Sequence, residues 1–174
     1  MRTIRPLDYV LAAVLTAAGV FLMWENISAG DADGLIHPPS TTSWAIVPAF
    51  LLVTVPIVAR RWNIAAVSAV TAIATAAHVL AFGWLTRCGV VLPLAFALSY
   101  ATARFSRGKA TLVSLAGIVA LLVVTLLRDS SADLAGALPL ALGGVTLFFG
   151  AGWLVQNRVS RRQPKPEPAV EIAA

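Results

Sequence analysis

The sequence predicts an all-α membrane protein, a polytopic bundle of six transmembrane helices with both termini in the cytoplasm. Three observations support this fold class. Hydrophobic residues make up 59% of the 174-residue chain and charged residues only 12%, whereas about a quarter of the residues in a soluble domain are charged. The apolar residues form long runs separated by short polar breaks. The basic residues gather at alternate breaks, which is the pattern of a multi-pass membrane protein.

Residues 60–109 contain a predicted helical hairpin that crosses the bilayer twice. Its first apolar run, 64–85, has 22 residues, and the polar break 86–88 separates it from a second run, 89–103. At ~1.5 Å per residue the first run is long enough for a hydrocarbon core of ~30 Å. The second run covers only ~22 Å. We therefore expect that helix to extend past its apolar limits, or the bilayer to thin around it.

Four further apolar runs complete the predicted bundle. The second contains Pro48 and Pro56, which are expected to kink it. The first could instead be a secretory signal, because basic residues precede it, but it is longer than a usual signal core. The four runs are 7–24, 43–59, 110–127 and 134–155, so the membrane domain is expected to cover 1–157. The tail, 158–174, has no periodicity and three prolines, and is predicted to be disordered.

The placement of the basic residues predicts the orientation. One set of alternate loops, taken with both termini, holds 11 of the 13 Lys and Arg residues, and the other set holds only Arg87 and Arg128. The positive-inside rule therefore places both termini in the cytoplasm. Short basic clusters between apolar runs determine topology, so we expect contact with the lipid bilayer and none with nucleic acid. The Arg-rich and Ala-rich composition suggests a GC-rich bacterial genome, as in actinomycetes, and hence a bacterial plasma membrane.

One stripe of polar residues lies inside the third predicted span. Ser68, Thr71, Thr75 and His78 are spaced so that a helix carries all four on one face. An ionisable residue at membrane depth is a candidate functional residue. The stripe could line a cavity open to the outside, where protonation of His78 would bias helix packing. Alternatively, a neutral His78 bonds to a carbonyl or hydroxyl of a neighbouring helix while the small residues allow close packing.

Arg87 and Cys88 lie at the tip of the predicted hairpin, on its outer side. Arg87 is a candidate for binding an anionic ligand or a lipid headgroup, or for pairing with Asp31, Asp33 or Asp129 from the other outer loops. Cys88 is a candidate for an intermolecular disulfide or a redox-sensitive thiol, and otherwise a packed small residue.

The sequence contains no recognisable enzyme, metal or cofactor motif. It has no phosphate-binding glycine loop, no HExxH, no CxxC and no pair of intramembrane carboxylates. A single cysteine excludes an intramolecular disulfide and a multi-cysteine metal site. Residues 31–34 resemble part of a calcium loop, but Ser40 stands where such a loop needs its closing glutamate, so we expect a solvated turn. Neither catalysis nor a cofactor is expected.

Two segments resemble the N-terminal membrane domain of actinobacterial sensor histidine kinases. They are RRWNIAAVSAV, and HVLAFGWLTRCGVVLPLAFALSYATARFSR, with the opening RPLDYVLAAVLTAAGV similar as well. The matching features are a double arginine, Arg60-Arg61, that opens the third span, and an LPLA...L.Y stretch, 92–100, that leads to a basic loop. The resemblance covers roughly residues 5–128. In those kinases the last span continues into a dimerisation helix with the phosphoacceptor histidine, whereas residues 158–174 contain no histidine.

The resemblance leaves open a free-standing sensor-like module, a remnant, or a piece of a longer protein. In each case we expect a non-catalytic signalling or accessory membrane module that has no phosphorylating activity of its own. Such a module is expected to associate through its helices with a membrane signalling partner or with further copies of itself. The alternative from another class is a small transporter or channel subunit that uses the His78 stripe as part of a pathway. A third possibility is a packing protein with no ligand.

Overall fold

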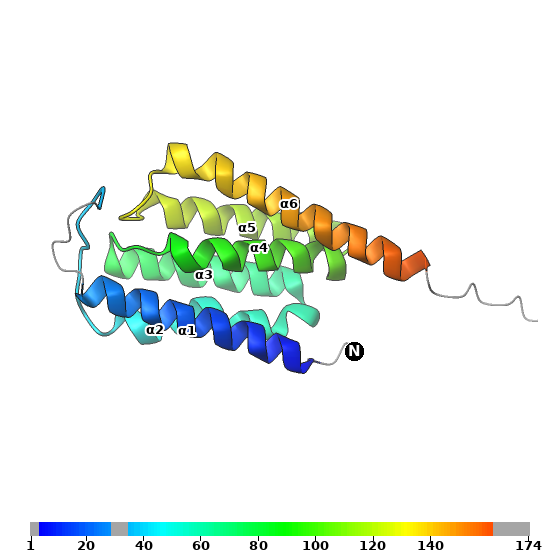
Figure 1. The fold of residues 1–174 in the computed structure, drawn as a ribbon, viewed down its shortest axis with the longest axis horizontal. Helices are drawn as coiled ribbons and strands as arrows, with labels where there is room; N and C mark the ends of the chain where they lie inside the picture. The colour runs from blue at the N-terminus through cyan, green and yellow to red at the C-terminus, as the bar shows by residue number, and fades with distance from the viewer. Residues whose placement is uncertain (1–3, 29–34, 162–174) are drawn as a thin grey trace, which may run out of the picture.

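The computed structural model describes residues 4–28 and 35–161, and every regular element within them is a helix. The helices run up and down between two ends of one bundle (Figure 1). We call the end that holds the start of α1 the arginine end, and the opposite end, with residues 83–88 and 128–131, the tip end. The elements are α1 (Pro6–Ser28), α2 (Ile46–Thr54), the 3-10 helix η1 (Val55–Arg61), α3 (Ile64–Phe82), α4 (Cys88–Phe105), α5 (Lys109–Leu127) and α6 (Leu134–Arg161).

Five of the helices are long and apolar enough to cross a membrane, namely α1, α3, α4, α5 and α6. Many large apolar side chains on them face outward; Leu80 and Leu140 are 86% and 80% exposed. Exposed apolar side chains in such numbers are typical of helices surrounded by lipid tails. The chain is thus a helical protein with five candidate membrane-spanning helices, in agreement with the expectation of a multi-pass membrane protein.

The expected second span, 43–59, is not one long α-helix. It consists of nine α-helical residues in α2 followed by seven 3-10 residues in η1. Pro48 lies in the first turn of α2, where its missing N–H is tolerated, whereas Pro56 lies at the start of η1, where an α-helix would need that N–H. Together the two segments rise about 27 Å if collinear. This rise is slightly less than a hydrocarbon core of ~30 Å, so the sixth crossing of the membrane stays a prediction.

The other helix boundaries differ from the predicted ones by a few residues. α3 ends at Phe82, three residues early, because Gly83 takes a φ of 65° and caps the helix through its N–H to Val79 O. α4 extends past its apolar limits at both ends, to 18 residues. α1 continues to Ser28, beyond the expected 24.

α6 corrects one prediction about the tail. It has 28 residues and continues to Arg161, so residues 158–161 are helical, while 162–174 lie outside the described residues. The helix continues because 156–161 contains no proline or glycine, and the first tail proline is Pro164. Both described ends of the chain lie at the arginine end, where α6 extends beyond the other helices (Figure 1).

Two helix pairs form the most extensive contacts, α3 with α5 and α4 with α6. Glycines allow the close approach at both contacts. A Cβ on Gly117 of α5 would lie 3.1 Å from Ser68 Cβ of α3, and a Cβ on Gly152 of α6 would lie 2.5 Å from Tyr100 O of α4. Not every glycine of α6 lies at such a contact, because a Cβ on Gly143 or Gly150 would meet nothing within 4 Å.

Candidate functional site at the tip of the hairpin

All four residues of the predicted polar stripe are buried. Thr75 Oγ1 donates to Thr71 O of the preceding turn at 2.9 Å. Ser68 Oγ and Thr71 Oγ1 have no hydrogen-bond partner among the described residues. The structure thus places the stripe inside the bundle and partly against α5, near Gly117.

His78 joins three parts of the tip end. Its Nδ1 lies 3.1 Å from Arg87 Nε, and its Nε2 lies 3.2 Å from Ile46 O at the start of α2. Because an arginine nitrogen only donates, Nδ1 is the acceptor, and Nε2–H donates to the carbonyl. Phe50 packs edge-on against the imidazole with ring centroids 5.3 Å apart, and Phe82 lies at 4.8 Å. The hydrogen bond to a neighbouring helix carbonyl is the geometry expected for a neutral, packed histidine.

Arg87, the candidate for binding an anionic ligand or a lipid headgroup, is fully buried. Nη1 donates to Arg128 O at 3.0 Å and to Leu85 O at 3.4 Å, while Nη2 has no partner among the described residues. Burial lowers the pKa of the guanidinium to about 10, and the nearby charge of Asp129 opposes this shift. Arg87 therefore remains charged at neutral pH, and its side chain supports the loops at the tip from inside.

Asp129 was one of three acids considered as partners for Arg87, and the other two, Asp31 and Asp33, lie outside the described residues. Its Oδ2 accepts from the backbone N–H groups of Arg87 and Cys88, both at 2.8 Å. Its Oδ1 accepts from Ser131 N at 3.0 Å and Ser131 Oγ at 2.7 Å. The carboxylate thus caps the N-terminus of α4 from the α5–α6 turn, and it contacts the Arg87 backbone.

Cys88 is the first residue of α4 and is half-buried, with Sγ 3.3 Å from Ser131 Oγ. The contact joins the two turns at the tip. A disulfide or redox role for this thiol stays a prediction.

Asn26 is a member of the tip network that the sequence reasoning missed. Its Nδ2 donates to Thr86 O at 2.9 Å and to Leu22 O at 2.8 Å, and its Oδ1 accepts from Thr86 N at 2.8 Å. The predicted first run ends at residue 24, so Asn26 fell in the loop after it, and nothing in the sequence indicated its burial. These bonds attach the end of α1 to the turn of the α3–α4 hairpin.

Residues 35–40 cover the tip. The N–H groups of Ile36 and His37 donate to Ser130 O, at 2.9 and 3.3 Å. Ser40 and Trp84 exchange two hydrogen bonds, both 2.8 Å, and the rings of His37 and Trp84 lie 3.9 Å apart. The loop that follows α1 is therefore connected to both turns that enclose Arg87.

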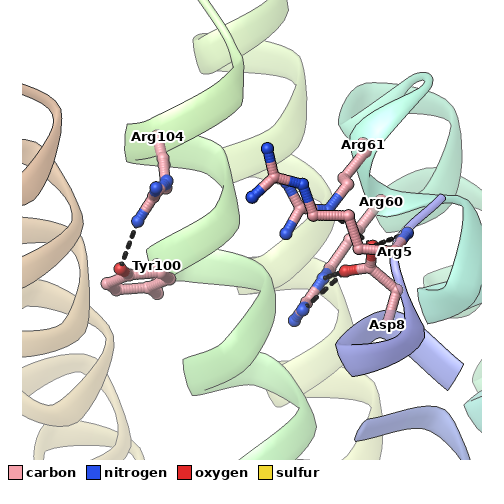
Figure 2. A network of polar contacts seen from close by, with 6 residues as sticks. All are labelled: Arg5, Asp8, Arg60, Arg61, Tyr100 and Arg104. Atoms are coloured by element: carbon pink, nitrogen blue, oxygen red, sulfur yellow. Dashed lines mark hydrogen bonds and ion pairs between the residues drawn. The ribbon is translucent and has the colours of Figure 1, made fainter. Parts of the chain in front are cut away.

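A second polar cluster lies at the arginine end, around Asp8 (Figure 2). Asp8 is fully buried in the first turn of α1 and bonds the side chains of Arg60 and Arg61 in η1. Asp8 was assigned no role from the sequence. A lone acid in an apolar run, with an arginine pair elsewhere at the same membrane level, was the signal that could have found this cluster.

Within 4–28 and 35–161, no group of three or more His, Cys, Asp or Glu side chains is placed to hold a metal ion. Comparison with protein-family models, with curated proteins and with solved structures found no match for the chain.

Proposed function

We propose that the chain is a non-catalytic signalling or accessory membrane module that transmits a change at the tip network along α6 to a membrane partner. One observation carries this proposal. The turn that contains Asp129 leads directly into α6, which begins at Leu134 and runs 28 residues to Arg161. A helix of that length covers ~42 Å, more than a hydrocarbon core of ~30 Å. α6 therefore reaches from the tip network to beyond the arginine end (Figure 1).

Two sequence features support the same proposal. The resemblance to histidine-kinase membrane domains concerns proteins in which the last span continues as a helix toward the signalling domains. The 11 to 2 distribution of basic residues favours the arginine end as the cytoplasmic one. In this orientation the tip network faces the outside of a bacterial plasma membrane and the extension of α6 faces the cytoplasm, where it contacts the partner.

The test is affinity purification from native membranes, followed by identification and stoichiometry of the co-purifying proteins. A chain ending after Gln156 keeps the membrane-spanning part of α6 and loses its last turn, whereas a chain ending after Arg161 keeps the whole helix and serves as the control. We expect a signalling protein in fixed ratio with the full chain and the control, and its loss from the shorter chain. A homo-oligomer without a partner, or a partner retained equally by both truncated chains, would contradict the proposal.

A small transporter or channel subunit is the second candidate. The observation that favours it is the set of buried side-chain atoms without a hydrogen-bond partner among the described residues, which are Ser68 Oγ, Thr71 Oγ1, Arg87 Nη2 and Ser130 Oγ. Buried polar atoms in native structures usually have partners, and water or a transported ion supplies them along a pathway. Solute flux into proteoliposomes that depends on His78, and is lost in His78→Ala, would favour this candidate over the signalling module.

A further inference from the structure

The arginine end carries far more positive than negative charge. Asp8 Oδ1 accepts from Arg60 Nε at 2.9 Å and from Arg60 Nη2 at 2.8 Å. Its Oδ2 accepts from Arg61 Nε and from Arg5 N, the latter at 2.9 Å. Four donors occupy both carboxylate oxygens. Asp8 is the one acid among the described residues of this end, against eight basic residues: Arg5, Arg60, Arg61, Arg104, Arg107, Lys109, Arg158 and Arg161.

Asp8 leaves donors of this cluster unused. Arg61 contacts Asp8 through Nε alone, so its two terminal nitrogens remain for another acceptor. Arg5 contributes only its backbone N–H, and its guanidinium forms no ion pair with a described residue. Figure 2 shows Arg5, Arg60 and Arg61 gathered around Asp8 on one side of α4, while Arg104 and Tyr100 lie on the other side. The three guanidinium groups and the one carboxylate of this cluster together carry a net charge of +2.

The cluster is held in a fixed position. The side chains of Arg60 and Arg61 are only 14% exposed, and Asp8 is fully buried. The guanidinium of Arg61 also lies 5.0 Å from the ring centroid of Phe105 at the end of α4. The positive charge of Arg60 and Arg61 therefore belongs to a preformed site, and the exposed Arg5 lies at its edge.

Exposed apolar side chains border the cluster. Leu7, next to Asp8 in α1, is 69% exposed, and Trp62, next to Arg61, is 65% exposed. Tryptophan prefers the boundary between hydrocarbon and headgroups, so the cluster lies at that level of the bilayer. A ligand at this position would have an anionic group for the arginines and an apolar part for the surface of α1.

We propose that Arg5, Arg60 and Arg61, arranged around Asp8, bind the phosphate of an anionic phospholipid. Guanidinium groups present parallel N–H donors that match phosphate oxygens, and charge-assisted bonds of this kind are about twice as strong as neutral ones. The two excess charges favour phosphatidylglycerol over zwitterionic phosphatidylcholine, which also contains a phosphate. Asp8 orients the arginines and does not contact the lipid.

Two variants separate this site from general attraction to a charged surface. Arg61→Lys keeps the charge and an ion pair with Asp8, but it replaces the planar guanidinium, with its two terminal nitrogens, by a single ammonium nitrogen. Arg5→Gln removes an unpaired charge and keeps the backbone contact with Asp8. Arg107→Gln is the matched control, because it removes the same charge from an exposed position in the α4–α5 loop of the same end.

The experiment titrates the purified full chain in detergent with phosphatidylglycerol or phosphatidylcholine and counts retained lipids by native mass spectrometry. Phosphatidylglycerol should be retained in preference, and its affinity should fall roughly tenfold in Arg61→Lys and in Arg5→Gln. Arg107→Gln should bind like the wild type. Equal losses in all three variants, or no loss in the first two, would overturn the proposal. So would displacement of the lipid by inorganic phosphate, which would identify free phosphate as the ligand.

Discussion

The hydrogen bond from Arg87 Nε to His78 Nδ1, 3.1 Å long, joins the last turns of α3 to the residue that precedes α4. It connects an ionisable residue of a candidate membrane-spanning helix to a fully buried arginine. The same imidazole donates to Ile46 O, so α2 is attached to the hairpin as well. His78 thus organises the tip end, and the first prediction concerns this pair.

We expect His78→Leu to destabilise the protein by ~1–3 kcal/mol, because the buried Nε of Arg87 would lose its acceptor. His78→Asn, whose amide oxygen can replace Nδ1 as an acceptor, should cost less. Thermal unfolding in detergent micelles measures both. Equal midpoints for the two variants would show that packing of the ring, and not the hydrogen bond to Arg87, is the contribution of His78.

Asp129→Asn tests the cap on α4. The amide cannot accept at both positions, so at least one of the N–H groups of Arg87, Cys88 and Ser131 loses its partner. We expect a loss of ~1–2 kcal/mol in unfolding free energy. Hydrogen exchange should also become faster at the backbone amides of residues 87 and 88. Asp133→Asn, at the exposed start of α6, should leave exchange at those amides unchanged.

The sequence predicted the approximate positions of the long apolar helices, because hydropathy and length indicate such helices. α5, for example, begins one residue before its predicted start and ends where expected. The sequence did not predict that α2 is followed by a 3-10 helix. A proline in an apolar run can either kink an α-helix or change its hydrogen-bond pattern, and the run itself does not distinguish the two. Gly83 ended α3 early through its positive φ, a backbone property that an apolar run does not reveal.

The polar contacts were harder to predict than the spans. The stripe of α3 follows from helical periodicity, and all its members are buried together. The contacts of Arg87, by contrast, depend on residues about forty positions away, such as Arg128, whose carbonyl accepts its Nη1. Asp8 and Arg61 lie 53 positions apart in the sequence. Such pairs are decided by how whole helices pack, and a single sequence contains no direct signal for them.

Gly152→Ala tests the contact between α4 and α6. Its new Cβ would lie 2.5 Å from Tyr100 O and 3.0 Å from Ala103 Cβ, so the two helices must move apart. Overpacking of this kind costs ~1–3 kcal/mol. Gly150→Ala on the same helix is the control, because a Cβ there meets nothing within 4 Å. A thermal unfolding midpoint that falls for Gly150→Ala as much as for Gly152→Ala would disprove this account of the contact.

Asp8→Asn tests the ion pairs at the arginine end. The substitution replaces a buried carboxylate with a neutral amide, and Arg60 and Arg61 lose their one counter-charge while remaining largely buried. Removal of one partner from a buried ion pair costs ~3–5 kcal/mol, and we expect a loss near the lower limit because both arginines can turn toward the headgroups. Glu25→Gln is the matched control, since it removes the same charge from an exposed position at the other end of α1.

The effect of Asp8→Asn should also depend on salt. The three arginines would repel one another without Asp8, and ions screen this repulsion, so the unfolding midpoint of the variant should recover partly as ionic strength rises. The wild type and Glu25→Gln should change little over the same range. If the midpoint of Asp8→Asn were insensitive to salt, the loss would come from the missing hydrogen bonds alone, and the excess positive charge of this cluster would have no energetic consequence for the fold.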